Sequence, residues 1–530
     1  MHHLKIAENK LRFLIVLLLI TGIFFRFFNL DLKVFWHDET FTLLRISGYT
    51  KNLAKQQIFN GHVITKESFA KFQSINTEKD IIDTIRSLET EDPQHPPLYY
   101  LIGRLWVQIF GNSVTAIRSL SAFISLLIFP SAYWLCRELF KGQLWVSEIA
   151  IALMAISPIQ LVYAQEAREY ILWLVTILLC NASLLRALRL ESTYPRLRIL
   201  NWGIYAVTLA ISLYTFLLSG FVAVGHAIYV IIIARFRLTG TVKAYFLASL
   251  AGFLAFIPWI LVLINNFLQF NTSTAWTTTH LPLEVLIKSW LLQLSRIFLD
   301  LDFGFENPFC YIITPIFFTF IAYSIYFLCR TSNYKIWLFI LTFILITALP
   351  LMVPDLIFGG IRSLSERYLL PFYFGIQLSV IYLLATKLNN QSFLRRRIWQ
   401  TITGLLIICG LVSYGVSSQA ETWWSKVISY GNPQVARIIN QTDRPLLITD
   451  AFGINYGNIF SLSYILEDKV KFELLNNQNV PNIPDIFTDI FLLNPSDIWR
   501  QKIEATYKYA SKVAYSDNNY LLWKLVKNSE

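Results

Sequence analysis

The chain has 530 residues, of which 55% are hydrophobic and 15% charged, with a formal net charge of +11 at pH 7. Soluble domains carry about a quarter charged residues, so the composition excludes an ordinary soluble protein and predicts a polytopic membrane protein. Residues 418–530 contain 12 acidic and 11 basic residues, so the positive excess lies in residues 1–417. The charge bias that orients membrane proteins accounts for this excess, and no nucleic-acid partner is predicted.

Apolar runs of about twenty residues, the length needed to cross a bilayer, recur up to residue 417. The first run, residues 11–29, is followed by bulky side chains and by no small-x-small cleavage pattern, which predicts an uncleaved anchor. Together with ten later runs it predicts a mainly α-helical, polytopic transmembrane protein of about 11–13 spans. The later runs lie near residues 115–137, 144–163, 169–188, 201–217, 219–234, 244–267, 309–328, 336–353, 368–386 and 399–416.

Basic residues decide the predicted orientation, because cytoplasmic loops carry an excess of Lys and Arg. With the N-terminus in the cytoplasm, every second connection is both cytoplasmic and basic. The segment 98–111 contains Arg104 and covers about 21 Å as a helix, short of a roughly 30 Å hydrocarbon core. We therefore predict that it is a juxtamembrane helix on the non-cytoplasmic surface. The basic connections contain Arg137 and Lys141; Arg186, Arg189, Arg196 and Arg198; Arg235, Arg237 and Lys243; Arg330 and Lys335; and Lys387, Arg395, Arg396 and Arg397.

Two domains are predicted from this layout. Residues 1–417 form the transmembrane domain, with a first outer loop at 30–114, and residues 418–530 form a small non-cytoplasmic domain. The second domain alternates strand-like and helix-like stretches, which indicates an α/β fold. Its strand-like runs are 445–450, 470–475 and 490–495, its helix-like runs are 433–441 and 496–510, and the run 520–526 closes it.

The stretch FWHDETFTLL, residues 35–44, places His37, Asp38 and Glu39 shortly after the first span. An acidic pair before an apolar-periodic run can simply begin a helix. Flanking Phe, Trp and Leu residues also wedge the acids into an apolar interface, where a partly desolvated carboxylate can accept a proton near neutral pH. Asp38 and Glu39 are therefore candidate catalytic residues, and His37 is a candidate substrate-binding residue.

A second cluster is HPPLYY, residues 95–100. Two prolines restrict the backbone and favour an extended conformation at His95. This arrangement suits a rigid turn before the juxtamembrane helix. It also holds the imidazole beside Tyr99 and Tyr100, where the three side chains could contact a polar head group.

Two further clusters lie at outer ends of spans. In QEAREY, residues 165–170, charged side chains can merely solvate a helix end, or Arg168 can bind an anion with Glu166 and Tyr170 nearby. In SERYLLP, residues 365–371, Arg367 and Tyr368 stand where positive charge is disfavoured, and an Arg there can pair with a lipid phosphate. Carboxylates and cations on one membrane face suit a reaction between a polar acceptor and a lipid-linked phosphate.

The order of these motifs resembles the GT-C superfamily of membrane glycosyltransferases. It is closest to the protein O-mannosyltransferases, the aminoarabinose transferases and the RgtA/B/C/D-like group. The resemblance covers residues 11–390 and is strongest over 11–190. It departs from the mannosyltransferases after the paired prolines, where Leu98-Tyr99-Tyr100 replaces a Gly-Lys pair. The motifs that carry it are DE at 38–39, HPPLYYLIGRLWVQIFG followed by Arg118, SPIQLVYAQEAREYILWL and ERYLLP.

The resemblance implies that a sugar moves from a polyprenyl-phosphate carrier to a hydroxyl of a lipid, glycan or protein acceptor, usually with inversion. Asp38 would be the general base, Glu39 and His95 would shape the pocket, and Arg168 and Arg367 would bind the phosphate. It also implies a multi-pass protein among the lipids of a bacterial inner membrane, with the active site and the C-terminal domain in the periplasm.

A metal is not required by the resemblance, because some superfamily members use a divalent cation and others do not. Glu166 would serve as a second acid or as a metal ligand. The five cysteines lie in or beside apolar runs and show neither disulfide nor zinc spacing, so no metal site is predicted from them.

Two alternative functions also fit a polytopic membrane protein. A transporter or flippase would carry ionisable residues near the midplane and paired broken helices, whereas the charges here lie at outer ends of spans. A polymerase or ligase of surface polysaccharide shares the donor and differs in the acceptor. The sequence leaves open the sugar, the acceptor, the isoprenoid length and the oligomeric state.

Overall fold

The structure is a computed structural model that describes residues 2–141, 143–191, 193–389 and 392–527. The chain separates into two compact units, each built from several stretches of sequence. The first unit comprises residues 1–28, 92–99 and 119–418. The second unit comprises residues 29–91, 100–118 and 419–530.

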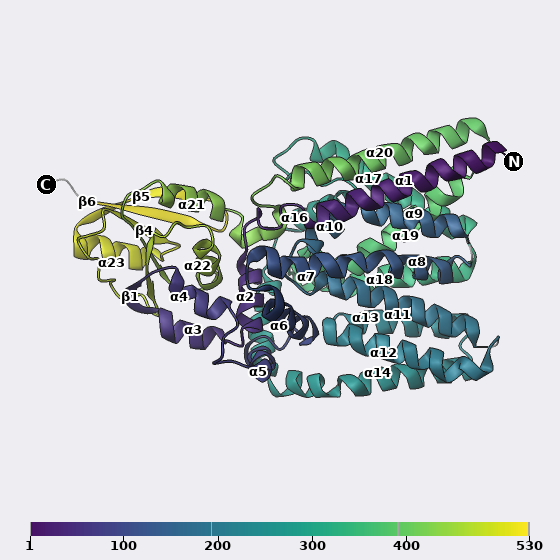
Figure 1. Cartoon of the computed structure of the whole chain (residues 1–530), viewed down its shortest axis with the longest axis horizontal. Coiled ribbons are helices and arrows are strands. Elements are labelled where there is room, and N and C mark those ends of the chain that lie inside the picture. Colours follow the sequence, from purple (N-terminus) through teal and green to yellow (C-terminus); the bar gives the residue numbers. More distant parts are fainter. Residues whose placement is uncertain (1, 142, 192, 390–391, 528–530) are drawn as a thin grey trace. The chain divides into compact units, whose positions relative to one another are not determined.

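The first unit is a bundle of helices, which Figure 1 shows as long ribbons running roughly parallel. Each of the eleven predicted apolar runs is helical. The helices of the bundle are α1 (His2–Phe27), α7 (Val114–Leu126), α8 (Ile128–Leu139), α9 (Leu144–Ala155), α10 (Pro158–Ala164), α11 (Tyr170–Leu190), α12 (Arg198–Thr215), α13 (Ser219–Ile233), α14 (Gly240–Asn265), α15 (Phe267–Thr274), α16 (Leu283–Arg296), α17 (Cys310–Thr331), α18 (Tyr334–Phe358), α19 (Leu370–Leu388) and α20 (Phe393–Ser417). Helix α7 begins in the second unit and continues into the bundle.

Seven helical segments within the described ranges are long and apolar enough to cross a membrane. An eighth candidate is the pair α9 and α10, which is bent by 60° where Pro158 begins the second helix. The predicted multi-pass helical architecture is therefore confirmed, with seven or eight candidate spans within the described ranges where about 11–13 were predicted. The seven segments are Val114–Leu139, Tyr170–Leu190, Gly240–Asn265, Cys310–Thr331, Tyr334–Phe358, Glu366–Leu388 and Phe393–Ser417.

The spans differ in how much of their surface the bundle covers. The spans Tyr170–Leu190 and Glu366–Leu388 are 83% and 89% buried, whereas α14 and α20 are 28% and 22% buried. Helix α11 packs against α8 and α12, and α19 packs against α9, α17 and α18. Both central spans begin at motifs that the sequence singled out, QEAREY and ERYLLP.

The second unit contains a six-stranded mixed sheet in the order β1-β3-β2-β4-β6-β5. The central strands β3, β2 and β4 are parallel, and the outer pairs are antiparallel. The strands are β1 (Asn60–Ile64), β2 (Pro445–Asp450), β3 (Lys471–Leu475), β4 (Asp489–Leu493), β5 (Tyr509–Ser516) and β6 (Leu521–Lys527). The helices of this unit are α2 (His37–Ile46), α3 (Lys51–Ile58), α4 (Glu67–Ala70), α5 (Ile81–Glu91), α6 (Leu98–Phe110), α21 (Asn432–Asn440), α22 (Asn455–Ser463) and α23 (Asp497–Tyr507).

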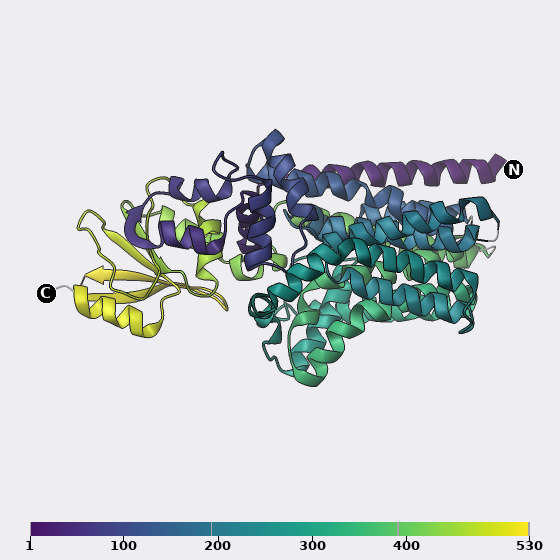
Figure 2. The ribbon, with the colours of Figure 1, turned by 90° about the horizontal axis from the view of Figure 1, so that it is seen from below.

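Apolar side chains pack on both faces of this sheet, and Figure 2 shows helices on both sides of it. Leu447 and Phe472 face a core shared with α21 and α22, and Leu446 and Ile448 face one shared with Trp499 of α23. Strand β2 is buried along its whole length, as expected for a central parallel strand. The predicted α/β fold of the C-terminal region is therefore confirmed, and the unit that contains it also includes residues 29–91 and 100–118.

One local prediction was wrong. The predicted helix 496–510 ends at Tyr507, because Lys508 adopts a left-handed conformation with φ of 55°, and strand β5 begins at Tyr509. Within the first outer loop, 30–114, the structure adds α3, α4 and the edge strand β1, which pairs with β3. The predicted helix over 98–111 is confirmed as α6.

Candidate functional site

The acidic pair lies in the first turn of α2, and its two members have different surroundings. The Glu39 side chain is fully buried, whereas the Asp38 side chain is partly exposed. Glu39 accepts two hydrogen bonds from Arg118, from Nε at 2.7 Å and from Nη2 at 2.6 Å. Lys426 Nζ lies 3.4 Å from the same carboxylate. The charge of Glu39 is thus compensated twice, while Asp38 faces a more open environment.

Arg118 also fixes the segment that leads into α2. Its guanidinium donates to the backbone carbonyls of Leu30 at 2.7 Å, Lys33 at 2.8 Å and Val34 at 2.8 Å. A guanidinium has five N–H donors in a rigid fork, so one buried side chain can bind a carboxylate and a turn of backbone at once. The pair Glu39–Arg118 therefore positions the start of α2, including Asp38.

His37 is held at the beginning of α2 by neighbours in the same unit. Its backbone N–H donates to Ser429 Oγ at 3.0 Å, and its ring lies 5.0 Å from the ring of Phe41. Gly457 packs directly against the imidazole, so that a β-carbon at this position would collide with it. His37 is therefore closely confined.

A second group of site residues lies in the first unit around Glu169. His95 Nδ1 is 2.9 Å and Arg168 Nη2 is 3.2 Å from Glu169 Oε1. Burial alone would raise the pKa of Glu169, but the positive charge of Arg168 and the contact with His95 outweigh it and lower the pKa to about 2. Glu169 is thus a buried anion that orients both His95 and Arg168.

The loop before α6 and the turn before α11 are both anchored within the first unit. Trp259 donates to the Pro93 carbonyl at 3.1 Å, and Ser273 donates to Gln94 at 2.8 Å, which fixes the backbone next to His95. Gln165 donates to the carbonyls of Phe25 and Phe28 at 2.8 and 3.0 Å. These bonds give the polar residues a rigid framework.

Tyr170 contacts two guanidinium groups. Arg168 and Arg367 lie 5.4 and 5.7 Å from the centre of its ring, and Arg168 also donates to its hydroxyl at 3.2 Å. Arg367 further contacts the rings of Trp276, at 5.7 Å, and Tyr368, at 5.5 Å. Stacking uses the face of a guanidinium and phosphate binding uses its in-plane N–H groups, so both can occur together.

The segment before Arg367 is ordered by a buried carboxylate. Asp355 accepts from Arg362 Nη1 at 2.9 Å and from both the backbone N–H and the hydroxyl of Ser363 at 2.7 Å. Gly360, with φ of 143°, lets the chain pass close to these groups, where a side chain would collide with Arg362 and Asp355. Asp355 therefore determines how the chain arrives at Arg367.

The remaining predicted residues are buried. Tyr99 is fully buried, and its hydroxyl is 2.8 Å from Ser121 Oγ. Tyr100 and Glu166 are each 1% exposed. The structure gathers His95, Arg168, Tyr170, Arg367 and Tyr368 in the first unit, and Asp38, Glu39 and His37 in the second.

Several residues at these positions were absent from the predicted set. Glu169 could have been found, because it lies inside the QEAREY motif. Arg118 was part of the resemblance but carried no predicted role. Trp276, Asp355 and Lys426 show no local sequence signal, since their contacts depend on tertiary structure.

No metal-binding group was found in the part of the chain that the structure describes, meaning no set of three or more His, Cys, Asp or Glu side chains that could hold an ion. The acids of the site are engaged by cations instead, Glu39 by Arg118 and Glu169 by Arg168. The donor set therefore gives no basis for a step through a metal.

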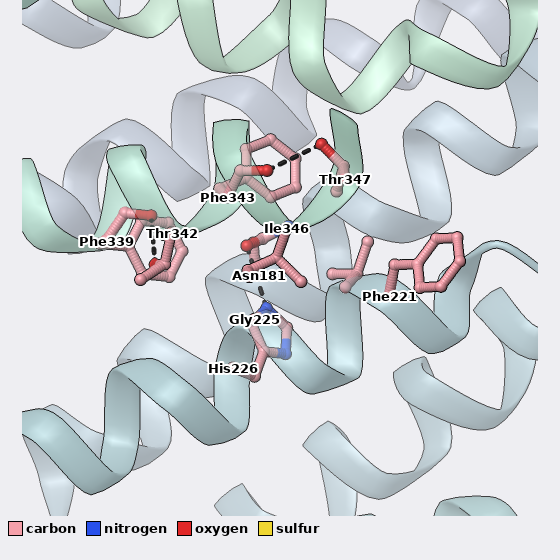
Figure 3. A pocket seen from close by; sticks show the side chains of 10 residues that line it. Asn181, Phe221, Gly225, His226, Phe339, Thr342, Phe343, Ile346 and Thr347 are labelled. Atoms are coloured by element: carbon pink, nitrogen blue, oxygen red, sulfur yellow. Dashed lines mark hydrogen bonds between the residues drawn. The ribbon is translucent and has the colours of Figure 1, made fainter. Parts of the chain in front are cut away.

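A separate buried polar group lies among the helices of the first unit (Figure 3). Asn181 Oδ1 is 3.1 Å from His226 Nε2, and Tyr205 OH is 3.2 Å from His226 Nδ1. The adjoining cavity offers about 10 Å³ to a water molecule, which is about room for one. These side chains satisfy one another, and the cavity is too small for a sugar.

Part of the chain matches a known protein family. Residues 94–262 match the family model described as dolichyl-phosphate-mannose-protein mannosyltransferase, a segment that contains His95, Arg168 and Tyr170. No curated protein sequence matches the chain.

Two crystal structures of ArnT from Cupriavidus metallidurans share the fold. The structure bound to undecaprenyl phosphate is 12% identical with a TM-score of 0.53, over 96% of this chain and 97% of that one. The apo structure is 11% identical with a TM-score of 0.54, over 98% of each chain. The chain therefore has the fold of ArnT, and the fold and the matched segment together confirm the predicted resemblance to the membrane glycosyltransferases of the GT-C superfamily.

Proposed function

We propose that this chain transfers a sugar from a polyprenyl-phosphate-linked donor to an acceptor hydroxyl on a lipid, glycan or protein. The observation that carries the proposal is the pair of guanidinium groups, Arg168 and Arg367, which both contact Tyr170 at the starts of two deeply buried spans. Phosphate is the anion that paired arginines bind well. The family description names a lipid-phosphate sugar, and the ArnT structure binds undecaprenyl phosphate, which supports the same donor class.

Asp38 is proposed as the general base. The acceptor oxygen attacks the anomeric carbon, its proton passes to the Asp38 carboxylate, and the bond from the anomeric carbon to the phosphate oxygen breaks. The electron pair leaves with the polyprenyl phosphate, whose charge Arg168 and Arg367 neutralise. A single displacement of this kind inverts the anomeric configuration. Help from a general base contributes roughly 10²–10⁴-fold to the rate.

The other site residues support these two roles. Glu39 is engaged by Arg118, so we assign it to positioning Asp38 rather than to proton transfer. His95, oriented by Glu169, would contact the sugar or its phosphate, and so would Tyr368. His37, Tyr99, Tyr100 and Glu166 would shape the substrate-binding region.

The proposed location is a bacterial inner membrane, with the reaction on the periplasmic side. The distribution of basic connections supports this orientation. The outer loop 30–114 and the domain formed by residues 418–530 would then both lie on the periplasmic side, and residues 1–417 would form the membrane domain.

The test compares the wild type with Asp38→Asn and with a control, Asp485→Asn, which changes an exposed acid in the same unit. Each purified protein is given polyprenyl-phosphate sugars and extracted envelope acceptors, and released polyprenyl phosphate is measured. We expect a loss of at least 10²-fold in Asp38→Asn alone. Equal release of polyprenyl phosphate by all three proteins would show that Asp38 is not the general base. The anomeric configuration of the product, measured by NMR, tests inversion.

A further inference from the structure

A hollow of about 560 Å³ with a mixed polar and apolar lining opens in the second unit beside helix α6. This volume lies within the range of about 300–1,000 Å³ that small-molecule sites occupy. The hollow is formed by the segment 75–81 and by one face of α6, and none of its side chains belongs to the site described above. Its polar lining consists of Asn76, Thr77, Lys79, Asp80, Arg104 and Gln108.

Arg104 is the buried member of this lining, with 2% of its surface exposed. Its guanidinium donates to the carbonyls of Ile46, at 2.8 Å, and Lys79, and to the hydroxyl of Thr84, at 3.1 Å. Its Nε is also buried and has no hydrogen-bond acceptor among the described residues. Through these bonds Arg104 holds α6 against the segment 75–81 and against the end of α2, and so fixes the wall of the hollow.

The charges around the hollow favour a neutral ligand that both donates and accepts hydrogen bonds. Lys79 and Arg104 are balanced by Asp80 in the lining and by Asp83, whose carboxylate is 3.3 Å from Lys79 Nζ. A phosphate would gain little from this balanced set. Sugar hydroxyls are both donors and acceptors and match a mixture of amides, cations and carboxylates. Ile75 and Ile81 supply apolar surface for the C–H face of a sugar ring.

Helix α6 presents an apolar stripe beside this polar face. Leu105, Ile109 and Phe110 are 53%, 73% and 56% exposed. Residues four apart lie on one face of a helix, so Leu105 and Ile109 form a stripe next to that of Arg104 and Gln108. A ligand with a saccharide head and a hydrocarbon chain would contact both stripes at once.

We propose that this hollow binds one or two sugar rings of the acceptor, and that the adjacent stripe favours a lipid-borne saccharide. The inference rests on the proposed function, because it names the acceptor of that reaction. It narrows the acceptor from lipid, glycan or protein to a saccharide, recognised through residues that are separate from the proposed base and phosphate ligands.

The experiment measures binding rather than turnover. The protein is placed in phosphatidylcholine nanodiscs and titrated with a panel of microbial oligosaccharides, each supplied free and attached to a twelve-carbon chain. Thr77→Trp and Gln108→Trp fill the hollow from exposed positions, and among the described residues no side-chain hydrogen bond is lost by either substitution. Thr90→Ala, on α5 outside the hollow, is the control.

We expect at least one saccharide to bind the wild type and Thr90→Ala equally, and to bind both Trp variants at least tenfold more weakly. Tighter binding of the lipid-borne form would identify a glycolipid head group, and equal binding would identify a free glycan. Failure of every saccharide to bind, or binding that the Trp variants leave unchanged, would overturn the proposal. Binding of a peptide panel in place of saccharides would also overturn it.

Binding of polyprenyl-phosphate sugars is measured on the same samples. Saccharide binding without donor binding would refute the proposed function and leave the hollow as a saccharide-binding site. Donor binding without saccharide binding would refute only the proposal that the hollow binds the acceptor.

Discussion

Replacing Glu39 by Gln separates a positioning role from a catalytic one within the acidic pair. The substitution keeps the shape of the side chain and removes its charge, which leaves Arg118 and Lys426 as buried cations without that carboxylate. Breaking a buried ion pair by removing one partner costs about 3–5 kcal/mol, because the remaining charge loses its compensation. Glu39 is fully buried and doubly hydrogen-bonded to Arg118, so the full range applies here.

For a unit of this size, 1 kcal/mol shifts the thermal midpoint by about 2–4 °C. We therefore expect Glu39→Gln to lower the midpoint by about 6–20 °C, measured by scanning fluorimetry of the detergent-solubilised protein. The control is Glu421→Gln, which breaks an exposed pair with Arg437 and should shift the midpoint by little, since exposed pairs contribute about 0–1 kcal/mol.

Activity measured well below the midpoint completes the comparison. Asp38→Asn should abolish transfer and keep the wild-type midpoint, whereas Glu39→Gln should lower the midpoint and keep part of the activity. A Glu39→Gln protein with the wild-type midpoint and no transfer would refute the reasoning, because it would place Glu39 in the chemistry.

Three further outcomes are expected. The pKa of Glu169 is lowered from 4.5 to about 2 in the folded state, so between pH 4.5 and 2 the unfolded state binds more protons than the folded state does. The thermal midpoint should therefore fall as the pH drops through this range. Glu169→Gln should remove that dependence. Asp355→Asn should weaken donor binding, because the segment that leads to Arg367 loses a buried hydrogen-bond acceptor. A titration with a polyprenyl-phosphate sugar would detect this change. Unchanged affinity would show that the order of this segment does not affect donor binding. Burial raises the pKa of Glu473 to about 7, so the folded state binds more protons between pH 4.5 and 7 and stability should fall as pH rises through 7. Glu473→Gln should raise the midpoint at pH 8, and a lower midpoint would contradict this assignment.

The helical architecture could be predicted from the sequence because it depends on local information. Apolar runs of sufficient length must form helices in a bilayer, since every backbone polar group needs a partner there. The ends of elements were less predictable. The helix-like pattern 496–510 overlaps the strand β5, and only the left-handed conformation of Lys508 separates α23 from it.

The candidate site was predictable where function and local pattern coincide. Asp38 and Glu39 could be predicted because they form an acidic pair within an apolar stretch. Arg367 could be predicted because it is a positive charge at the outer end of a span. The partners of these residues were not predictable, because they come from distant positions. Lys426 lies 387 residues after Glu39, and Trp276 comes from a segment without any motif.

The arrangement of the first unit explains why its site residues stand at the starts of α11 and α19. These two spans are the ones that the bundle covers most, at 83% and 89%, so packing on all sides fixes their ends. Helices at the periphery, such as α14 and α20, keep most of their surface uncovered and carry none of the predicted site residues. Binding a phosphate through two arginines requires both guanidinium groups to hold their distance, since a shift of about 1 Å can cost 10²-fold in rate. A membrane enzyme whose lipid-facing helices contact a fluid solvent therefore benefits from placing such groups on its central helices.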